Sequence, residues 1–486
     1  MARRAWKTRF GFYLAAIGSA FGLGSLWRFP YIVAENGGGA FVCLYLVLVV
    51  IMGVPLLIGE LMIGKFTRRG VLGAQRQLVA QAQSSQSMSF VANEPGSRGA
   101  SLKNLRSRRA KLLIGMMPVA GVLATLCCIF ILAYYIVISG WVLFFLGRFL
   151  YLPLMALPSA AEQTEFISQS FTQLHDSGWM QMGLAVVHLA VVVIVVAKEV
   201  EEGIERWIGF IMPIFVGILL VLVFKSLSMS SSIEALRYFM YPDFSKLNIN
   251  SLGYAVGQIC FTLSIGFATM VTFGSYLQDE SLVPPTGFRV AFLDSLTAVI
   301  AGLMIFPLVI SGAASAHGPE LLFQTVPEFL AKLEGGFIYG IFFFICLYLA
   351  ALGASISLLE TAVSNLCENS QLTRGRASLY AGAAILLTAL IPAFSSSTLR
   401  AFTWHNRGLL EIIDLVLING VVPFVALMLG LIVAFEVNDK VKRDEFVAMQ
   451  SPSGEVLYSH WNFLIKWVVP PIIVLALVLQ LIGLFR

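Results

Sequence analysis

AIGSAFGLGSLWRFP, residues 16–30, is the segment that most narrows the possible folds of this chain, and ENGGGAF follows it at residues 35–41. The segment lies in the first of many long apolar stretches, yet each of its three central glycines costs a helix about 1 kcal/mol relative to alanine, and its proline removes a backbone donor. We therefore expect a helix that breaks here. In a bilayer, a broken backbone is tolerated only where it is buried in protein or lines a cavity. Close helix packing is the alternative reason for such glycines.

The composition indicates a protein that crosses a membrane many times. Of its 486 residues, 58% are hydrophobic and only 12% are charged, and the mean hydropathy is +0.85. A soluble domain carries about 25% charged residues. The formal net charge of +5 does not indicate a nucleic-acid partner, because the basic residues gather in loops. No nucleophile–base pair or metal-binding constellation is found at membrane depth, so we do not expect an enzyme.

Apolar segments of about 20 residues, the length that crosses a bilayer as a helix, are expected at eleven places. They lie near residues 10–34, 40–64, 112–150, 180–198, 206–228, 252–277, 288–312, 337–366, 378–395, 409–436 and 461–485. The third is too long for one perpendicular crossing, so we expect it to tilt or to project from the bilayer. The predicted fold class is an all-α membrane protein with eleven transmembrane helices.

Basic residues predict the orientation. They cluster before the first span and in the loop at 65–111, whereas the loop at 152–178 has no Lys or Arg. The positive-inside rule then puts the N-terminus in the cytoplasm, and eleven crossings put the C-terminus outside. Residues 75–100 are rich in Gln and Ser, and we interpret them as a flexible cytoplasmic insertion. The outer loop at 313–336 has an amphipathic run that could fold over the outer face as a lid.

A later apolar segment repeats the features of the first. GQICFTLSIGF, residues 257–267, also places hydroxyls and a glycine at mid-bilayer, five spans after the first break. Two interrupted helices that open two five-helix halves are typical of inverted-repeat transporters, which bind solutes and ions near the midplane. We assign residues 1–228 to the first half and 229–437 to the second. Residues 438–486 would form a cytoplasmic loop and one extra C-terminal helix.

Several motifs, in order along the chain, resemble those of the neurotransmitter:sodium symporter family, whose bacterial members carry amino acids. They are GLGSLWRFPY (22–31), ENGGGAF (35–41), GVPLL with Glu60 (53–60), AYYIV (133–137), GIERW (203–207), GQICFTLSIGF (257–267), ALGASISLLE (351–360) and Asp414. The resemblance covers nearly the whole chain. It implies a secondary active symporter in a bacterial-type inner membrane that brings a hydrophobic amino acid into the cell by alternating access. A non-transporting amino-acid sensor is the alternative.

The resemblance also implies a substrate site. An amino acid is a zwitterion, and both of its charged ends need partners in a low-dielectric site. Backbone groups at the two breaks and a few hydroxyls would bind these ends, and apolar side chains would enclose the rest. The positions that correspond to the family pattern are Ala20, Leu23, Gly24, Ile131, Tyr135, Phe261, Thr262, Ser264, Gly266, Phe267, Ala354 and Leu358.

A first ion site is implied at Ala20, Ser25, Thr262 and Asp294, where Na⁺ is the candidate ion. Two of these positions depart from the family pattern, because Ser25 and Asp294 each replace a common Asn. A fixed carboxylate at Asp294, near Tyr45 and Gln258, would supply the negative charge that chloride supplies in chloride-dependent relatives. We therefore predict chloride independence.

A second ion site of the family is predicted to be degraded in this chain. Its positions are Gly18, Phe21, Ala350, Gly353 and Ala354. The last two replace residues with hydroxyl ligands, and the loss of two of about five ligands should abolish useful sodium affinity. Two couplings stay open: a single Na⁺ at the first site, or H⁺ bound by Asp294, Glu35 or His188. No covalently bound cofactor is expected.

The charged ends of the site are expected to close as gates. Arg28 is costly in lipid unless it is paired, and Asp414 is its expected partner on the outer side. Arg3 with Glu368, near Ser275 and Tyr276, would form the inner counterpart, although Arg3 is equally well explained as a positive-inside residue. Glu60 and Glu360 are expected to brace helices. The partners implied are a hydrophobic amino acid and the lipid bilayer, and the oligomeric state stays open.

Overall fold

The computed structural model describes most of the chain, and it is almost entirely helical there. The described residues are 9–20, 22, 24–91, 100–155, 159–311, 321–370, 372–404, 407–448 and 453–484. Within these ranges the backbone forms no strand, and only one isolated bridge joins Trp404 to Arg407. The all-α class predicted from the sequence is therefore confirmed.

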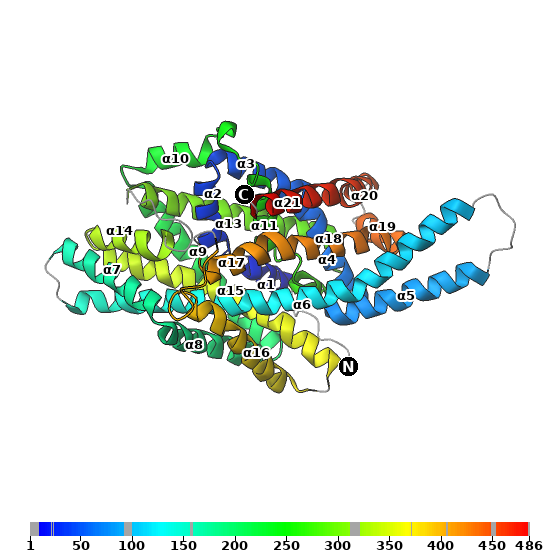
Figure 1. Ribbon diagram of the computed structural model, residues 1–486, viewed down its shortest axis with the longest axis horizontal. Coiled ribbons are helices and arrows are strands. Elements are labelled where there is room, and N and C mark those ends of the chain that lie inside the picture. The colour runs from blue at the N-terminus through cyan, green and yellow to red at the C-terminus, as the bar shows by residue number, and fades with distance from the viewer. Residues whose placement is uncertain are drawn as a thin grey trace.

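Long helices run roughly parallel to the long axis of the molecule (Figure 1). In the first half of the chain, the helices are α1 (Arg9–Ala20), η1 (Gly24–Arg28), α2 (Phe29–Glu35), α3 (Gly39–Leu48), η2 (Val49–Gly53), α4 (Val54–Thr67), α5 (Val71–Val91), α6 (Ala100–Tyr151), η3 (Leu152–Met155), α7 (Ala160–Asp176), α8 (Gly178–Val196), η4 (Glu201–Glu205), α9 (Arg206–Leu227) and α10 (Ser232–Met240). The second half contains η5 (Phe244–Lys246), α11 (Ser251–Thr262), α12 (Thr269–Gly274), α13 (Val283–Ser311), η6 (Leu321–Thr325), α14 (Val326–Lys332), α15 (Gly336–Asn369), α16 (Arg374–Phe394), α17 (Leu409–Val416), η7 (Leu417–Val421), α18 (Val422–Phe435), α19 (Asp439–Val447), α20 (Ser453–Phe463), η8 (Leu464–Val468) and α21 (Val469–Leu484).

Nine helices of the described residues are long and apolar enough to cross a membrane. They are Gly39–Thr67, Lys111–Met155, Gly178–Val196, Glu202–Leu227, Val283–Ile310, Gly336–Asn369, Arg374–Phe394, Leu409–Phe435 and Gly454–Gly483, and they match nine of the predicted spans. The two other predicted spans, 10–34 and 252–277, are interrupted in the structure. The chain is therefore a multi-pass helical membrane protein, and the total of eleven crossings stays a prediction.

The helices pack in two groups with α1 between them. In one group, α6, α8, α15 and α16 all contact one another, and in the other α4 packs against both α12 and α13. Helix α1 contacts α15 on one side and α13 on the other. The broken first helix thus lies where the two groups meet.

The loop predicted to be a flexible insertion is largely helical, which corrects our interpretation of residues 75–100. Helix α5 has 21 residues and continues to Val91, and α6 begins at Ala100 and runs for 52 residues. The two helices contact each other and project together beyond the other helices (Figure 1). Low hydrophobicity indicated a loop, but a polar helix can be stable when a neighbouring helix supports it.

At the opposite end of the molecule, η6 and α14 cover the outer ends of α6 and α15. The Phe323 ring of η6 lies 5.4 Å from the Trp141 ring and 6.1 Å from the Phe145 ring, both on α6. The ring of Phe344 on α15 stacks on Phe145 at 5.4 Å. Residues 321–332 thus pack against α6 and α15 at this end of the molecule, and a lid over the outer face stays a prediction. Residues 312–320 lie outside the described residues.

A buried lysine fixes the link between α18 and α19. The Nζ of Lys442 donates to the carbonyl oxygens of Val433 and Ala434, both at 3.1 Å, at the C-terminal end of α18. It also lies 2.7 Å from the Asp439 carboxylate. Burial lowers the pKa of the Lys442 ammonium, while the neighbouring Asp439 opposes that change. The ammonium thus caps the helix end with a charge of the favourable sign.

Close packing between α4 and α12 depends on two glycines, which gives the first prediction. A Cβ at Gly64 would overlap the Val271 carbonyl oxygen, and one at Gly274 would lie 2.5 Å from the Leu61 carbonyl oxygen. Overpacking of this kind costs about 1–3 kcal/mol. Gly64→Ala should therefore lower the thermal unfolding midpoint of the detergent-solubilised protein.

The control for this experiment is Gly217→Ala on α9, because no atom lies within 4 Å of the added Cβ there. We expect its midpoint to equal or exceed that of the wild type. Equal midpoints for the two variants would contradict the inferred contact between α4 and α12.

Candidate binding site

The first helix breaks where the glycines predicted it. Helix α1 ends at Ala20, and the π-helical turn η1 begins at Gly24. Between them, the Ser25 N–H donates to the Gly22 carbonyl oxygen at 3.2 Å. Pro30 lies in the first turn of α2, where a missing backbone donor costs little. Phe21 and Leu23 lie outside the described residues.

The sixth helix breaks six residues before α12 begins. Helix α11 ends at Thr262, and Ser264, Gly266 and Ala268 all have positive φ angles, of 56°, 87° and 71°. Serine and alanine rarely adopt this conformation, so the surrounding structure must hold them there. One such contact is the Gly266 N–H, which donates to the Glu60 Oε1 at 2.7 Å. Glu60 thus braces the break, as expected.

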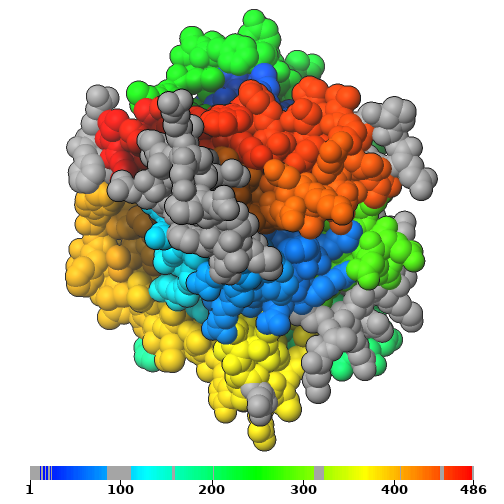
Figure 2. All heavy atoms as spheres, turned by 90° about the vertical axis from the view of Figure 1, so that its right-hand side faces the viewer, coloured from blue at the N-terminus to red at the C-terminus, as the bar shows by residue number. Residues whose placement is uncertain are grey.

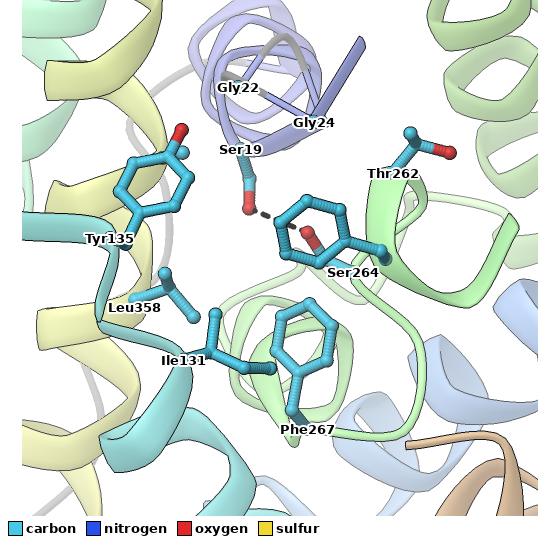
Figure 3. A pocket seen from close by; sticks show the side chains of 11 residues that line it. Ser19, Gly22, Gly24, Ile131, Tyr135, Thr262, Ser264, Phe267 and Leu358 are labelled. Atoms are coloured by element: carbon cyan, nitrogen blue, oxygen red, sulfur yellow. Dashed lines mark hydrogen bonds between the residues drawn. The ribbon is translucent and has the colours of Figure 1, made fainter. Parts of the chain in front are cut away.

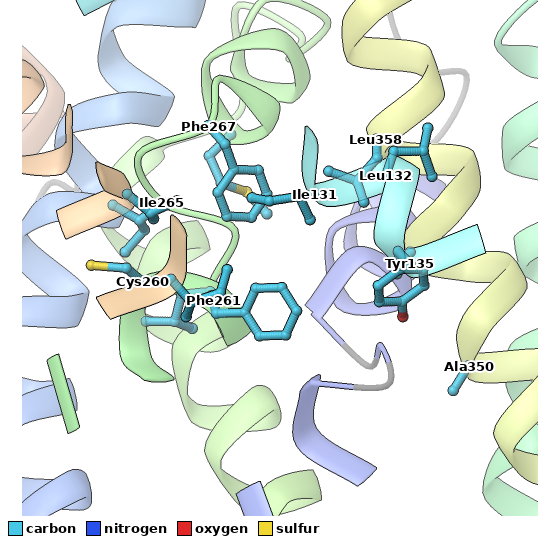
Figure 4. Close-up of a cluster of buried hydrophobic side chains, with 14 of the residues drawn as sticks. Ile131, Leu132, Tyr135, Cys260, Phe261, Ile265, Phe267, Ala350 and Leu358 are labelled. Carbon is cyan, nitrogen blue, oxygen red and sulfur yellow. The ribbon is translucent and has the colours of Figure 1, made fainter. Parts of the chain in front are cut away.

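A small pocket, with an accessible volume of about 20 Å³, lies between the two breaks. Figure 3 shows hydroxyl groups from both broken helices on its wall, and apolar side chains from α6, from α15 and from Phe267 in the second break on the other sides. The lining residues are Ser19, Gly22, Gly24, Ile131, Tyr135, Phe261, Thr262, Ser264, Phe267, Ala354 and Leu358. The apolar ones belong to a continuous buried cluster (Figure 4).

Nine of the twelve residues that the sequence singled out for substrate line this pocket. Of the other three, Ala20 is the last residue of α1 and Leu23 lies outside the described residues. Gly266 does not line the pocket. Its backbone faces Glu60 and the Val422 carbonyl oxygen instead, because its role is to allow the turn after Ser264.

Two lining residues were missed by the sequence analysis. Ser19 shares a hydrogen bond with Ser264, with 3.1 Å between the two hydroxyl oxygens, so this bond joins the two breaks directly (Figure 3). Gly22 faces Tyr135 and Ala354. The sequence could have indicated Ser19, because a residue four positions before Leu23 lies on the same face of a helix as the contacts expected there.

The glycines of the break leave room for the rings that close the pocket. A Cβ at Gly24 would lie 2.7 Å from a carbon of the Phe261 ring. A Cβ at Gly22 would lie 2.8 Å from the Tyr135 hydroxyl and 2.9 Å from the Ala354 Cβ. Larger residues would therefore push the rings away from the broken helix, which is why these two positions require glycine.

A buried polar cluster lies beside the pocket and includes three residues of the first predicted ion site. The Ser25 hydroxyl donates to Asp294 at 3.2 Å, and the Tyr45 hydroxyl donates to the other carboxylate oxygen at 3.4 Å. The Tyr45 and Thr262 hydroxyl oxygens are 3.2 Å apart. All four side chains are buried. A buried carboxylate surrounded by hydroxyl oxygens is a donor set suited to a hard monovalent cation.

The second predicted ion site has a different structure. Gly353 of α15 packs against α1, and a Cβ there would lie 2.8 Å from the Gly18 carbonyl oxygen. Ala354 and Ala350 are buried on the same helix, and Phe21 lies outside the described residues. Helices α1 and α15 therefore approach closely at Gly18 and Gly353, and the loss of the second ion site stays a prediction.

Arg28 joins the outer ends of several helices. Its Nε donates to Asp414 at 3.1 Å, its Nη1 to Gln258 at 2.7 Å and its Nη2 to Asn419 at 2.9 Å. The Gln258 amide in turn donates to the Gly24 carbonyl oxygen at 3.0 Å. The network therefore links an ion pair to the backbone of the break. The pair with Asp414 is direct, and sequence reasoning missed Asn419.

This network closes the outer side of the pocket. The Arg28 guanidinium lies 5.8 Å from the centre of the Phe261 ring, which lines the pocket below it. The hydroxyls of Tyr31 and Tyr134 donate to Asp414 at 3.5 and 3.4 Å. Both charged side chains are nearly inaccessible, with exposed fractions of 1% and 10%.

On the inner side, the described partners of Tyr276 and Glu368 lie on α15 and at the start of α5, and the predicted pair of Arg3 with Glu368 stays a prediction. The Tyr276 hydroxyl donates to Glu360 at 2.7 Å, and Glu360 forms an ion pair with Arg374. The Gly70 N–H donates to Glu368 at 2.7 Å. Arg3 lies outside the described residues. Tyr276 is thus bonded to Glu360, and Glu368 contacts the start of α5.

The other two candidate proton carriers have contrasting environments. His188 on α8 is buried, and its Nε2 lies 2.9 Å from the Ser355 hydroxyl. Glu35 is exposed at the end of α2. Only Asp294 is both buried and part of the polar cluster beside the pocket.

The arrangement is suited to binding and not to bond-breaking chemistry. Freed backbone groups and hydroxyls face a pocket whose other walls are apolar, which suits a small solute with charged ends. Among the described residues, no group of three or more His, Cys, Asp and Glu could hold a metal ion. A multi-pass helical protein with an enclosed pocket between two broken helices belongs to the class of secondary transporters.

The chain belongs to the sodium:neurotransmitter symporter family, because the family model matches residues 3–90 and 157–485. It is therefore a secondary transporter of a sodium-dependent symporter family and not an enzyme. The chain is 29% identical to an uncharacterized sodium-dependent transporter, YhdH, of Bacillus subtilis (strain 168), over 98% of this chain and 97% of the relative. It is 24% identical to the sodium-dependent dopamine transporter of Bos taurus, over 81% and 58% of the two chains.

A solved structure is similar over the whole chain. The crystal structure of MhsT in complex with L-phenylalanine matches with a TM-score of 0.83 and 28% identity, and the match covers 98% of this chain and 100% of that one. The resemblance found in the sequence motifs is thus confirmed.

The buried ion pair gives a prediction that does not depend on the solute. Asp414→Asn would leave the Arg28 charge buried without its counter-charge, and breaking a buried pair in this way costs about 3–5 kcal/mol. We expect a marked fall in the thermal unfolding midpoint. Glu455→Gln is the control, because its ion pair with Arg443 is exposed, at 49% and 58%, and should contribute about 0–1 kcal/mol. Equal effects would contradict the role of the outer network.

Proposed function

We propose that this protein brings a hydrophobic amino acid into the cell by alternating access, driven by an ion gradient. The observation that carries the proposal is the pocket between two broken helices, where backbone groups and hydroxyls face apolar walls. The family membership supports ion-driven transport, and MhsT, which resembles this chain along its whole length, was crystallised with L-phenylalanine.

Each end of the amino acid has a proposed partner. The carboxylate would bind N–H groups at the start of the second half of the broken helix, near Leu23 and Gly24, together with the Tyr135 hydroxyl, because a helix N-terminus favours an anion. The ammonium would bind carbonyl oxygens at the two breaks and the Ser264 hydroxyl. In this scheme, the ammonium replaces the hydrogen bond between Ser19 and Ser264.

The remaining walls favour an apolar side chain. Ile131 and Leu358 are aliphatic, Phe267 is aromatic, and Ala354 leaves space because it is small. A charged side chain would lose its hydration here without gaining a partner. We therefore propose aliphatic or aromatic amino acids of medium size as substrates.

For the coupling ion, we propose a single Na⁺ beside Asp294. The cluster of Ser25, Thr262 and Asp294 supplies oxygen ligands, and the carboxylate supplies a full negative charge. The relatives are named sodium-dependent, which favours Na⁺ over H⁺. The close approach of Gly353 to Gly18 supports loss of the second site. Transport should then be independent of chloride.

Closure of the site is proposed to involve two gates. The outer gate would be Arg28 with Asp414, and the inner gate would be Arg3 with Glu368 and Tyr276. The arrangement in a bacterial-type inner membrane, with the N-terminus in the cytoplasm and the C-terminus outside, is supported by the basic residues of the loop at 65–111.

Uptake into proteoliposomes tests the proposal. We expect leucine or phenylalanine to accumulate under an inward Na⁺ gradient, and the rate to be unchanged when gluconate replaces chloride. Accumulation driven only by a pH gradient would replace Na⁺ by H⁺ in the scheme. Saturable binding without uptake under any gradient would support the alternative, an amino-acid sensor, which the missing hydroxyls at Gly353 and Ala354 favour.

Asp294→Asn tests the fixed charge separately. The neutral amide keeps an oxygen ligand but removes the negative charge, so sodium affinity should fall by at least about tenfold and chloride should then stimulate uptake. The measurement is uptake against Na⁺ concentration, with and without chloride. Uptake that is unchanged and indifferent to chloride would remove Asp294 from the ion site. Ser295→Ala, a neighbouring buried hydroxyl, is the control.

A further inference from the structure

The cytoplasmic end of α15 is held by the start of α5. The carboxylate of Glu368 accepts from the Gly70 N–H at 2.7 Å, and the Asn365 side-chain oxygen accepts from the Leu72 N–H at 3.3 Å. One turn further along, the Arg76 guanidinium donates to Asn369 at 2.6 Å. Three successive side chains on one face of α15 thus bind the first turns of α5.

These contacts satisfy groups that a helix cannot satisfy itself. The first N–H groups of any α-helix have no partner within the helix, and an anion near them is favoured by the helix dipole. Glu368 and Asn365 supply acceptors for two of them. Arg69 contributes less, because its Nε lies 3.9 Å from the carboxylate and its side chain is 54% exposed. The Gly70 N–H is therefore a stronger partner for the Glu368 carboxylate than the Arg69 side chain is.

The Glu368 carboxylate also lies close to the Cα of Gly73. A Cβ at Gly73 would overlap the Glu368 carboxylate, so the carboxylate lies directly against the first turn of α5. We call residues 70–73 the Glu368 seat. The seat holds the carboxylate at a defined position, because its side chain is only 17% exposed and is bounded on this side by backbone atoms.

The seat lies where the two groups of helices meet on this face. Helix α4 ends at Thr67, and the next residue, Arg68, has a φ of 55° and turns the chain towards α5. The Arg68 guanidinium contacts the Leu277 carbonyl oxygen and the Asp279 carboxylate, which follow α12. Figure 2 shows the start of α5, in blue, beside the yellow end of α15. Residues 68–73 therefore contact both groups within six residues.

We propose that the Glu368 seat positions the Glu368 carboxylate, and that closure of the cytoplasmic side depends on this seat. Gly70 and Gly73 are positioning residues in this scheme, because they act through Glu368. The inference rests on the proposed function in so far as Glu368 belongs to the inner gate. Its new element is that the position of the carboxylate is set by the backbone of α5.

Gly73→Ala tests the seat without removing any charge. The added methyl group displaces the Glu368 carboxylate from the Gly70 N–H. In the double variant Gly73→Ala with Glu368→Asp, the shorter side chain at position 368 makes room for this methyl group. Gly375→Ala is the matched control, since Gly375 is at the start of α16 with no atom within 4 Å of the added Cβ.

Cys367, which is partly exposed beside Glu368, reports opening of this face. Its rate of alkylation by a maleimide is measured in inside-out vesicles, in a Cys43→Ala background, because the other four cysteines are buried. Gly73→Ala should accelerate labelling about tenfold, since a hydrogen bond to a charged group contributes at least this factor to an equilibrium. The double variant should return to within about threefold of the parent.

Labelling of Gly73→Ala at the rate of the control would overturn the proposal, as would a double variant that labels as fast as the single one. If Gly73→Ala does not fold, Arg76→Ala replaces it, because the exposed Arg76 side chain donates to Asn369 on the same end of α15. Labelling of Cys367 should then rise in Arg76→Ala. Labelling is independent of uptake. If the variants label as expected but the protein transports no amino acid, only the proposed function is overturned. If the protein transports but Gly73→Ala labels at the rate of the control, only the role of the Glu368 seat is overturned.

Discussion

A peptide group without a helical partner is costly at the centre of a bilayer, and this protein carries two runs of such groups. Each N–H or C=O that lacks a partner in lipid costs several kcal/mol, so both breaks must be enclosed by protein. The packing of α1 between α15 and α13 meets this requirement for the first break. The contact between Glu60 and Gly266 meets part of it for the second. The pocket is a consequence, because enclosing two breaks side by side leaves polar groups facing each other.

The outer network extends this principle from the backbone to a charge. Arg28 follows directly on the first break, and its guanidinium can be buried only because Asp414, Gln258 and Asn419 each accept one of its hydrogen bonds. Gln258 also binds the Gly24 carbonyl oxygen. One amide, that of Gln258, therefore binds both the buried guanidinium and the backbone of the first break.

The sequence predicted the features that depend on local chemistry. Glycines at Gly22 and Gly24 predicted the first break, and the long apolar segments predicted the helices, because both follow from backbone energetics and hydropathy. It failed where tertiary contacts decide. Residues 75–100 are polar and were interpreted as a flexible insertion, yet α5 continues to Val91 and packs against α6. Asn419 and Ser19 were missed because each acquires its role from a partner more than 200 residues away.

Helix α6 joins two regions that are usually considered separately. One continuous helix of 52 residues carries the projection at its beginning and two residues of the pocket wall, Ile131 and Tyr135, further along. Its only interior proline is Pro118, between these regions, where the missing donor makes the rod easiest to bend. A bend at Pro118 would therefore change the angle between the projecting part of α6 and the part that lines the pocket.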